Sequence, residues 1–369
     1  MARIPSLRQR PQRGVSLVEL MVGLVIGAIA VLVVMQVFRL SEGARRSTVG
    51  GDDAQITGAL AITTLQREIK QAGYGANAFP TLGCSITLPG GWTIPMMAPF
   101  SINPMLAPAT PLIPGADPNT DTVLVVRGDK GGSPEGDLVS AQAVQATYSV
   151  ATPTTFAAGD FVVAAQEWII ANTPRPVATP CALTLERVTA VVAPSPPTVT
   201  VGVGVAGMVN GTLYNFGPAP QILAYRVRNG NLTVCDYMVN NCSLAANNDD
   251  ATIWLPIASG VVSLRAQYGR DTSAPSMDAI VDTFDQVAPA TQCDWARVSA
   301  LRLAVVARSG ELSKVGEEPT TAANAPQWAA SDAAPIDLSG NPDWQRFRYK
   351  TFETTAPLRN MAWQGVQPC

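Results

Sequence analysis

The chain lacks the residues on which many enzymes and most zinc sites depend. None of its 369 residues is histidine, which is the commonest side-chain general base and the commonest metal ligand. A serine or cysteine nucleophile would therefore have no histidine partner, and the sequence shows neither a glycine-rich phosphate loop nor paired catalytic carboxylates. The sequence predicts no catalytic residue, no cofactor and no metal site, so we expect a protein that is not an enzyme.

Two short segments carry side-chain oxygens at spacings that calcium sites also use. Asp117, Asn119 and Asp121 alternate along the chain, and residues 247–250 form a second stretch of asparagine and aspartate. The glycine and the distal glutamate of an EF-hand loop are missing after Asp117. A turn is the simpler interpretation of both segments, and calcium binding stays open as the alternative.

The six cysteines predict disulfides. They all follow the N-terminal apolar segment, and none forms a CxxC pair, which argues against a metal or redox site. A local disulfide is expected between Cys235 and Cys242, across a turn at residues 237–241. The other expected pairs are Cys84 with Cys181 and Cys293 with Cys369.

A carboxylate lies inside an apolar segment. From Val15 to Phe38 the clearly polar side chains are Ser16, Glu19 and Gln36. As a helix rising ~1.5 Å per residue, this stretch spans about 36 Å, enough to cross a hydrocarbon layer about 30 Å thick. An unpaired Glu19 at full depth would cost roughly 2.5 to 3.5 kcal/mol, so the charge requires a partner. An ordinary signal peptide is disfavoured, because apolar sequence continues past its small-residue site at residues 28–30.

The charge distribution indicates the orientation of this helix. Four arginines (Arg3, Arg8, Arg10 and Arg13) precede it, and the first fourteen residues contain no acidic side chain. The positive-inside rule therefore places the N-terminus in the cytoplasm. The rest of the chain has 21 basic and 28 acidic residues, which predicts no nucleic-acid partner.

The segment from Gly14 to Leu20 resembles the signature of prepilin leaders, with a glycine, a new N-terminus and a glutamate at the fifth mature position. The resemblance implies that prepilin peptidase removes residues 1–14 by cutting after Gly14, and that the Val15 amine is methylated. The cut creates an ammonium group within one helical turn of Glu19, on the same or an adjacent subunit. The alternative is that Glu19 only complements the positive end of its own helix.

The elements that position these residues are a long helix and a β-rich head. No proline lies between Pro11 and Pro80, so the transmembrane and polymerisation helix of residues 15–38 is expected to continue through residues 39–73 on the periplasmic side. An apolar stripe there should pack on the head: Ile62, Leu65, Ile69 and Ala72. Four glycines weaken the helix, and a kink or break is expected near Gly50, with a fresh start capped by Asp52 or Asp53.

Residues 74–369 predict a large antiparallel β-rich head, which makes the fold class α+β. Short apolar runs alternate there with turn residues, and Asn229-Gly230 indicates a hairpin. Residues 86–118 are proline-rich and are expected to form a long loop. The candidate strands are residues 122–127, 161–165, 198–205, 223–228, 232–237, 261–268 and 301–308.

Three separated segments resemble one family, the PilW-type minor pilins of type IV pili. They are the leader with its helix, residues 67–74, and the C-terminal stretch from Tyr349 through residues 357–363. The resemblance implies a single-pass inner-membrane protein with a periplasmic head that joins other minor pilins and the major pilin. It further implies a priming role in pilus assembly and a place at the tip beneath a PilY-type adhesin. Val15 and Gln36 depart from the phenylalanine and proline that many pilins carry there.

Two other functions stay open from the sequence. A J-type minor pseudopilin of type II secretion shares the leader and the general plan, and a single-pass anchored periplasmic enzyme would keep an uncleaved Gly14. Size favours the tip over the shaft. The head has about 300 residues and a radius of gyration of roughly 19 Å, which is bulky for a subunit repeated along bundled helices.

Overall fold

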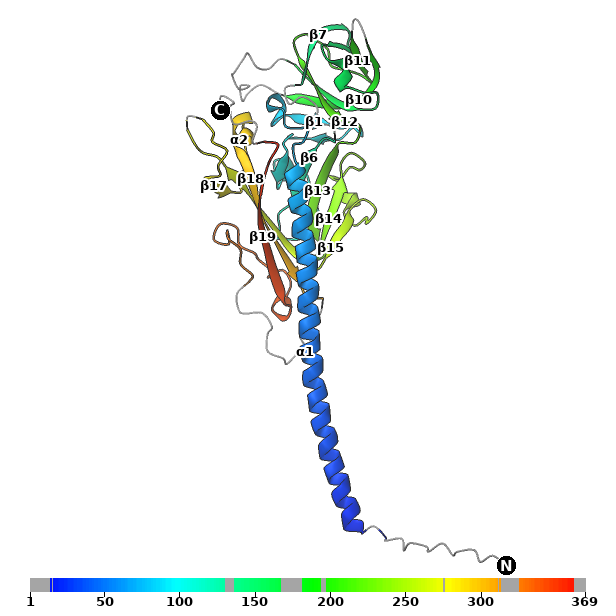
Figure 1. Ribbon diagram of the computed structural model, residues 1–369, viewed down its shortest axis with the longest axis vertical. Coiled ribbons are helices and arrows are strands. Elements are labelled where there is room, and N and C mark those ends of the chain that lie inside the picture. Colours follow the sequence, from blue (N-terminus) through cyan, green and yellow to red (C-terminus); the bar gives the residue numbers. More distant parts are fainter. Residues whose placement is uncertain are drawn as a thin grey trace, which may run out of the picture. The chain divides into compact units, whose positions relative to one another are not determined.

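The computed structural model describes residues 14, 16–129, 136–166, 181–193, 197–274, 276–310, 312 and 325–361, without the side chains of residues 40 and 42–50. The chain divides into two compact units, residues 1–50 and 51–369. Helix α1 (Leu17–Gln71) supplies the described helical part of the first unit and the first element of the second. The fold class is α+β, as the sequence predicts (Figure 1).

Of the kink or break expected near Gly50, the break is wrong, because α1 is helical through Gly50 and Gly51. Asp52 and Asp53 lie inside the helix and do not cap a new one. Glycine costs a helix about 1 kcal/mol relative to alanine but keeps its backbone N–H, so it weakens the hydrogen-bond ladder without interrupting it. The helix ends two residues before Gly73, whose φ of 77° is the left-handed conformation typical of a helix C-terminus.

A five-stranded antiparallel sheet forms one side of the second unit. Its order is β15 (Leu255–Ser259), β14 (Asn231–Asp236), β13 (Gln221–Arg228), β6 (Val123–Arg127) and β3 (Phe100–Ile102). The predicted hairpin is confirmed, since Asn229 and Gly230 join β13 to β14 with φ values of 51° and 71°. Both positive angles suit the type I′ turns that match the twist of paired strands.

A four-stranded sheet forms another body of the second unit. Its order is β17 (Thr283–Asp285), β16 (Val261–Arg270), β18 (Val298–Arg308) and β19 (Tyr349–Pro357). Thr291 and Asp294 form a capping box at the start of α2 (Gln292–Ala296), which leads into β18. The apolar stripe of α1 is buried as predicted: Leu65 and Ile69 are each 1% exposed and belong to one core with residues of both sheets.

A small closed β-barrel is the third body. Its strands are β7 (Asp137–Val144), β8 (Thr147–Val150), β9 (Phe161–Ala165), β10 (Ala182–Val192), β11 (Thr198–Val201) and β12 (Thr212–Gly217). They lie in the order β11-β8-β7-β12-β9-β10, and β10 also pairs with β11, which closes the ring. Val139, Tyr148 and Leu213 fill an apolar interior of its own. In Figure 1 the labels of β7, β10 and β11 lie at the end of the second unit, while β9, β10 and β12 share a further core with β6 and β13.

Residues 86–118 are not the single long loop that their prolines suggested. They contain β2 (Thr93–Ile94), β3, β4 (Met105–Ala107), β5 (Thr110–Pro111) and most of β1 (Ser85–Thr87). Each strand has only two or three residues, too few to show an alternating pattern in sequence. β1 pairs in parallel with β10 and carries β2 at its other edge, so this segment extends the barrel sheet.

The other strand predictions are mostly confirmed, apart from 198–205, where β11 ends at Val201. The sequence analysis predicted no strand at β7, β8, β10, β12, β15 or β17. Short 3-10 turns complete the described elements: η1 (Phe79–Thr81), η2 (Pro153–Thr155), η3 (Ala245–Asn247) and η4 (Trp344–Arg346).

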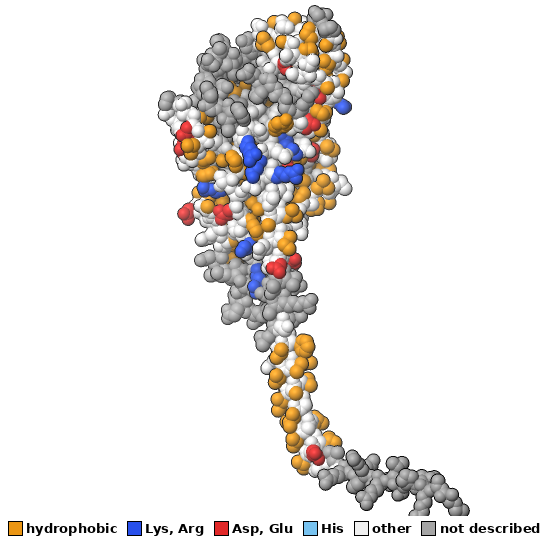
Figure 2. All heavy atoms as spheres, viewed as in Figure 1, with side chains coloured by type: hydrophobic (Ala, Val, Ile, Leu, Met, Phe, Trp, Pro, Cys, Tyr) orange, Lys and Arg blue, Asp and Glu red, His pale blue; other side chains and the backbone are white. Residues whose placement is uncertain are grey.

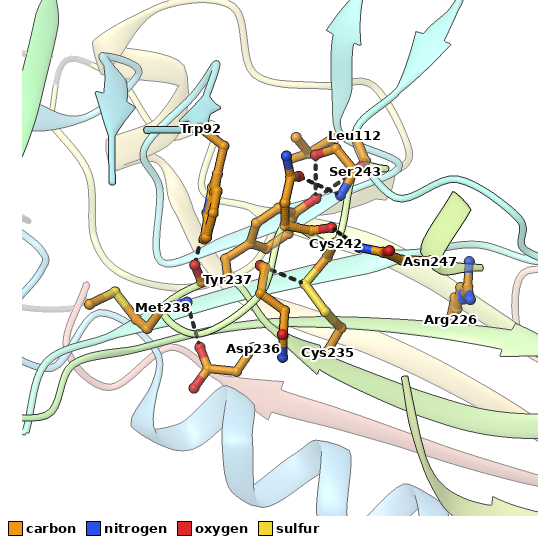
Figure 3. The surroundings of a disulfide bond; sticks show 12 residues. Trp92, Leu112, Arg226, Cys235, Asp236, Tyr237, Met238, Cys242, Ser243 and Asn247 are labelled. Atoms are coloured by element: carbon orange, nitrogen blue, oxygen red, sulfur yellow. Dashed lines mark hydrogen bonds between the residues drawn. A yellow bond between two sulfur atoms is a disulfide. The ribbon is translucent and has the colours of Figure 1, made fainter. Parts of the chain in front are cut away.

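Two disulfides join the pairs put forward from the sequence, Cys84 with Cys181 and Cys235 with Cys242. Cys369, the expected partner of Cys293, lies outside the described residues. Figure 3 shows how the smaller disulfide loop holds Tyr237. The Tyr237 hydroxyl donates to the Leu112 carbonyl at 2.7 Å, and its own carbonyl accepts from Trp92 at 2.9 Å. The loop thus ties β14 to the segment around β2 and β5.

Candidate functional site: the N-terminal segment and the helix-to-head junction

Gly14 lies exposed and non-helical just before α1 begins at Leu17. A side chain built at Gly14 would meet no described atom within 4 Å, and its φ is not positive. Neither crowding nor backbone strain in the described chain therefore requires glycine at this position. Val15 lies outside the described residues.

Glu19 lies in the first turn of α1 and is exposed. The helix begins with the Leu20 amide donating to the Ser16 carbonyl at 3.1 Å. The unpaired N–H groups of a first turn favour a nearby carboxylate. This position suits both interpretations of Glu19. An ammonium group at a new N-terminus and the positive end of the helix dipole would both lie at the N-terminal end of α1, close to the Glu19 carboxylate.

The segment from Leu17 to Arg39 is long and apolar enough to span a membrane. Its 23 residues give about 34 Å of helix, and all its side chains are exposed in the first unit. Figure 2 shows hydrophobic side chains covering the visible face of this stretch. In water such a surface would be unfavourable, so the segment requires lipid or other helices around it.

Arg127 joins the last turns of α1 to the five-stranded sheet. Its guanidinium lies 3.4 Å from the Glu68 carboxylate, and both side chains are mostly buried. The same guanidinium donates to the side-chain oxygens of Gln71 on the helix and Gln221 on β13. Glu68 and Gln71 belong to the segment that resembles PilW, and the structure gives both of them this anchoring role.

Asn360 closes the C-terminal end of α1. Its side-chain amide donates to the carbonyl of Ala72 at 2.9 Å and to that of Gln71 at 3.4 Å. Its own carbonyl accepts from the Asn77 side chain at 2.6 Å. The last carbonyls of a helix have no partner within the helix, so Asn360 satisfies acceptors that would otherwise face the junction. Asn360 lies in the C-terminal stretch that resembles PilW, but the sequence did not predict its contact with the end of α1.

Gly58 allows α1 to approach β19 closely. A Cβ built at Gly58 would lie 2.1 Å from the ring of Phe352, far inside van der Waals contact. Two helical turns further on, the Gln66 amide donates to the Thr354 hydroxyl at 2.9 Å. The sequence treated Gly58 as a weak point of the helix, whereas the structure uses it as the contact point with the sheet.

The two acidic segments do not gather around a common point. Asp117 accepts from the turn amides of Asn229 and Gly230, Asn119 donates to Asp337, and Asp121 pairs with Arg265 at 3.1 Å. These side chains serve three different contacts. Among the described residues, no group of three or more cysteine or carboxylate side chains is arranged to hold a metal ion.

The second segment binds arginine side chains. Asn248 accepts from Arg226 at 2.7 Å, and Asp249 pairs with Arg228. Arg226 is fully buried and stacks on the Trp254 ring, 3.7 Å from its centroid. Burial lowers the pKa of Arg226 to about 10. These contacts of Arg226 and Arg228 hold the loop at residues 247–250 against β13.

Two family models match the chain. Residues 9–35 match the prokaryotic N-terminal methylation motif. This match places the chain in the class of prepilin-type proteins. Residues 225–360 match PilW, the type IV pilus-assembly protein W. Together the two matches support a PilW-type minor pilin of the type IV pilus. The PilW match begins in β13 and ends at Asn360, so it includes the four-stranded sheet and the residue that closes α1.

No curated protein matches the chain. Among solved structures, a type IV-like pilin from Thermus thermophilus shares 12% identity over 55% of this chain and 85% of its own, with a TM-score of 0.25. That likeness is too weak to support an inference. The methylation motif and the apolar helix fit inner-membrane anchoring and a place in the pilus, and the pilus context implies prepilin peptidase and other pilins as partners.

Proposed function

We propose that this PilW-type pilin is a sparse subunit that primes pilus assembly and sits at the tip, in contact with other minor pilins and a PilY-type adhesin. Its role is structural and non-enzymatic. Prepilin peptidase cuts between Gly14 and Val15, the Val15 amine is methylated, and Glu19 pairs with that amine during assembly. The N-terminal methylation motif carries the processing part of this proposal.

The size of the head supports the tip. The second unit starts at Gly51 and contains the last part of α1, two sheets and the barrel. Helices that pack together lie about 8 to 10 Å apart, while compact chains of this length have radii of gyration near 20 Å. Such heads would crowd one another if repeated at every position of a shaft. A tip contains only a few subunits, so large heads would not crowd one another there.

An epitope inserted at Pro108 tests the location, because Pro108 is exposed between β4 and β5. The proposal expects label at filament ends and loss of pili when the gene is deleted. Label spaced along whole filaments would contradict a tip position. If deletion of the gene leaves piliation normal and abolishes protein secretion, the J-type pseudopilin would be favoured.

The Glu19→Ala variant tests the charge pair, with Gln36→Ala as a control polar position in the same helix. We expect Glu19→Ala to be processed and to stay in the membrane but to fail to enter pili. Normal incorporation of Glu19→Ala would show that the pair with the Val15 amine is unimportant.

A further inference from the structure

The barrel is an insertion between two paired strands. Arg127, the last residue of β6, lies directly opposite Gln221, the first residue of β13, in the antiparallel ladder. The chain leaves the five-stranded sheet at one point and returns at the neighbouring point, and β7 to β12 lie between them. A two-residue turn suffices to join such strands. The sheet therefore does not need the barrel to complete its own pairing.

The barrel is also separate from the PilW-like part of the chain. The PilW match begins at Tyr225, after the last barrel strand. The barrel is nevertheless held firmly, because β10 pairs with β1 and the neighbouring Cys84–Cys181 disulfide joins the same two segments. The barrel has an apolar interior of its own, and its strands β9, β10 and β12 also share a second core with β6 and β13. An addition held this firmly is a suitable platform for binding, since little order is lost when a partner docks.

The base of the barrel lies where α1 ends. The Gly128 amide, just after β6, donates to the Tyr74 carbonyl at 2.6 Å, and Arg127 contacts Gln71 in the last turn of the helix. Helix α1 enters this unit at Gly51, about 30 Å earlier along its axis. Within the second unit, the barrel is therefore attached at the end remote from the point of helix entry.

The described part of the barrel carries few charged side chains. Its described segments, residues 136–166, 181–193 and 197–217, contain four charged side chains: Asp137, Asp160, Glu186 and Arg187. The first two are buried, and Glu186 accepts from the backbone amides of Val203 and Gly204. Within these segments, only Arg187 is both charged and exposed. Figure 2 shows the barrel end with mostly hydrophobic and uncharged side chains on the visible face.

Strand β7 and the loop between β11 and β12 carry exposed apolar side chains of the barrel. Leu138 and Val144 at the two ends of β7 are 56% and 61% exposed. The loop between β11 and β12 runs beside them, since the Asn210 amide donates to the Val139 carbonyl at 2.9 Å and the Gln145 side chain donates to the Gly204 carbonyl at 2.9 Å. We call this surface the barrel face, and it consists of Leu138, Ser140, Ala141, Ala143, Val144, Val203 and Val209.

We propose that the barrel face docks a second protein of the pilus tip, one that presents an uncharged, aliphatic surface. The proposal rests on the proposed function. The barrel face carries no charge that would pair with a charged partner, whereas charge-depleted apolar residues are typical of the buried centres of interfaces. An anionic membrane or a nucleic acid would require basic side chains, which the barrel face lacks.

A photo-cross-linking residue at Val144 in the full-length protein tests the docking surface in cells that make pili. Val287 is the matched control, because it is 69% exposed and lies next to the four-stranded sheet. We expect Val144 in sheared pili to cross-link to another tip protein that Val287 does not capture. Adducts with a second copy, with the major pilin of the shaft or with lipid, or no adduct at all, would overturn the proposal.

The double variant Val144→Asp with Val203→Asp provides a second test, with Val287→Asp as its control. Charges on the barrel face should reduce the co-isolated partner at least ten-fold, while processing and entry into pili stay unchanged. An unchanged amount of partner would overturn the docking surface and leave the proposed function standing. Absence of the wild-type chain from pili would defeat the proposed function itself, and with it this inference.

Discussion

The side-chain amide of Asn360 donates to the carbonyl of Ala72 at 2.9 Å, across 288 positions of sequence. This contact joins the end of α1 to the segment that follows β19. It makes the helix C-terminus dependent on the end of the PilW-like region.

Replacing Asn360 by alanine should destabilise the junction. The carbonyl of Ala72 would lose the Asn360 side-chain donor, whereas that of Gln71 keeps the Tyr74 amide. A buried carbonyl that loses its donor costs about 1 to 3 kcal/mol. Thermal unfolding of the variant measures this as a lower Tm. Arg359→Ala is the control, because Arg359 is exposed in the same loop. Equal Tm values for both variants would contradict the closing role of Asn360.

Replacing Gly58 by leucine should disturb the contact between α1 and β19. The new side chain would overlap the Phe352 ring, and overpacking of this kind costs typically about 1 to 3 kcal/mol. Ala59→Leu serves as the control, since Ala59 is the exposed neighbour in the same helix. Limited proteolysis and Tm should separate the two variants. If Gly58→Leu is as stable as Ala59→Leu, the close approach is unimportant.

The two disulfides should differ in their contribution to stability. Cys84–Cys181 closes a loop with a sequence separation of 97, whereas the separation for Cys235–Cys242 is 7. Chain entropy then predicts losses of roughly 4 to 5 kcal/mol and 2 to 3 kcal/mol when each pair is replaced by serine. Denaturant unfolding of both double-serine variants measures the difference. A larger loss at the short loop would refute this ranking.

Asp271 should make stability depend on pH in acid. Burial raises the pKa of Asp271, but hydrogen bonds from the amides of Ser273, Ala279 and Asp278 outweigh burial and hold the pKa below its usual value. A lowered folded-state pKa gives stability that is present above the unfolded pKa of about 3.9 and is lost as pH falls through the folded pKa.

The Asp271→Asn variant tests this dependence. It should be less stable than wild type at pH 6 by about 1 to 3 kcal/mol, and this difference in stability should narrow as the pH falls from the unfolded pKa of about 3.9 through the lowered pKa of the folded state. Asp332→Asn, at an exposed position, should show no such change. A gap for Asp271→Asn that is constant with pH would exclude a role for the ionised carboxylate.

Local chemistry in the sequence predicted a good part of this fold. The proline-free stretch predicted α1, and Asn229-Gly230 predicted its hairpin because both residues tolerate positive φ. Glu19 stood out because a carboxylate does not suit a membrane helix, and Gly14 stood out by its spacing from Glu19 in the prepilin leader signature. Each of these features depends on neighbours within a few residues, which a single sequence displays directly.

Contacts between distant residues could not be predicted in this way. The fit of Gly58 against Phe352 and the pairing of Asn360 with Ala72 join the two ends of the chain. The closure of the barrel depends on β10 pairing with both β9 and β11. Strand periodicity shows which face of a strand is buried but does not name its partner.

Mass spectrometry of the native N-terminus tests the central claim most directly. The protein should be isolated from membranes and pili of cells with an active prepilin peptidase. We predict a chain that starts at Val15 and carries a methyl group on its amine, with Gly14 and the preceding residues removed. A chain in these samples that retains residues 1–14 would contradict the account.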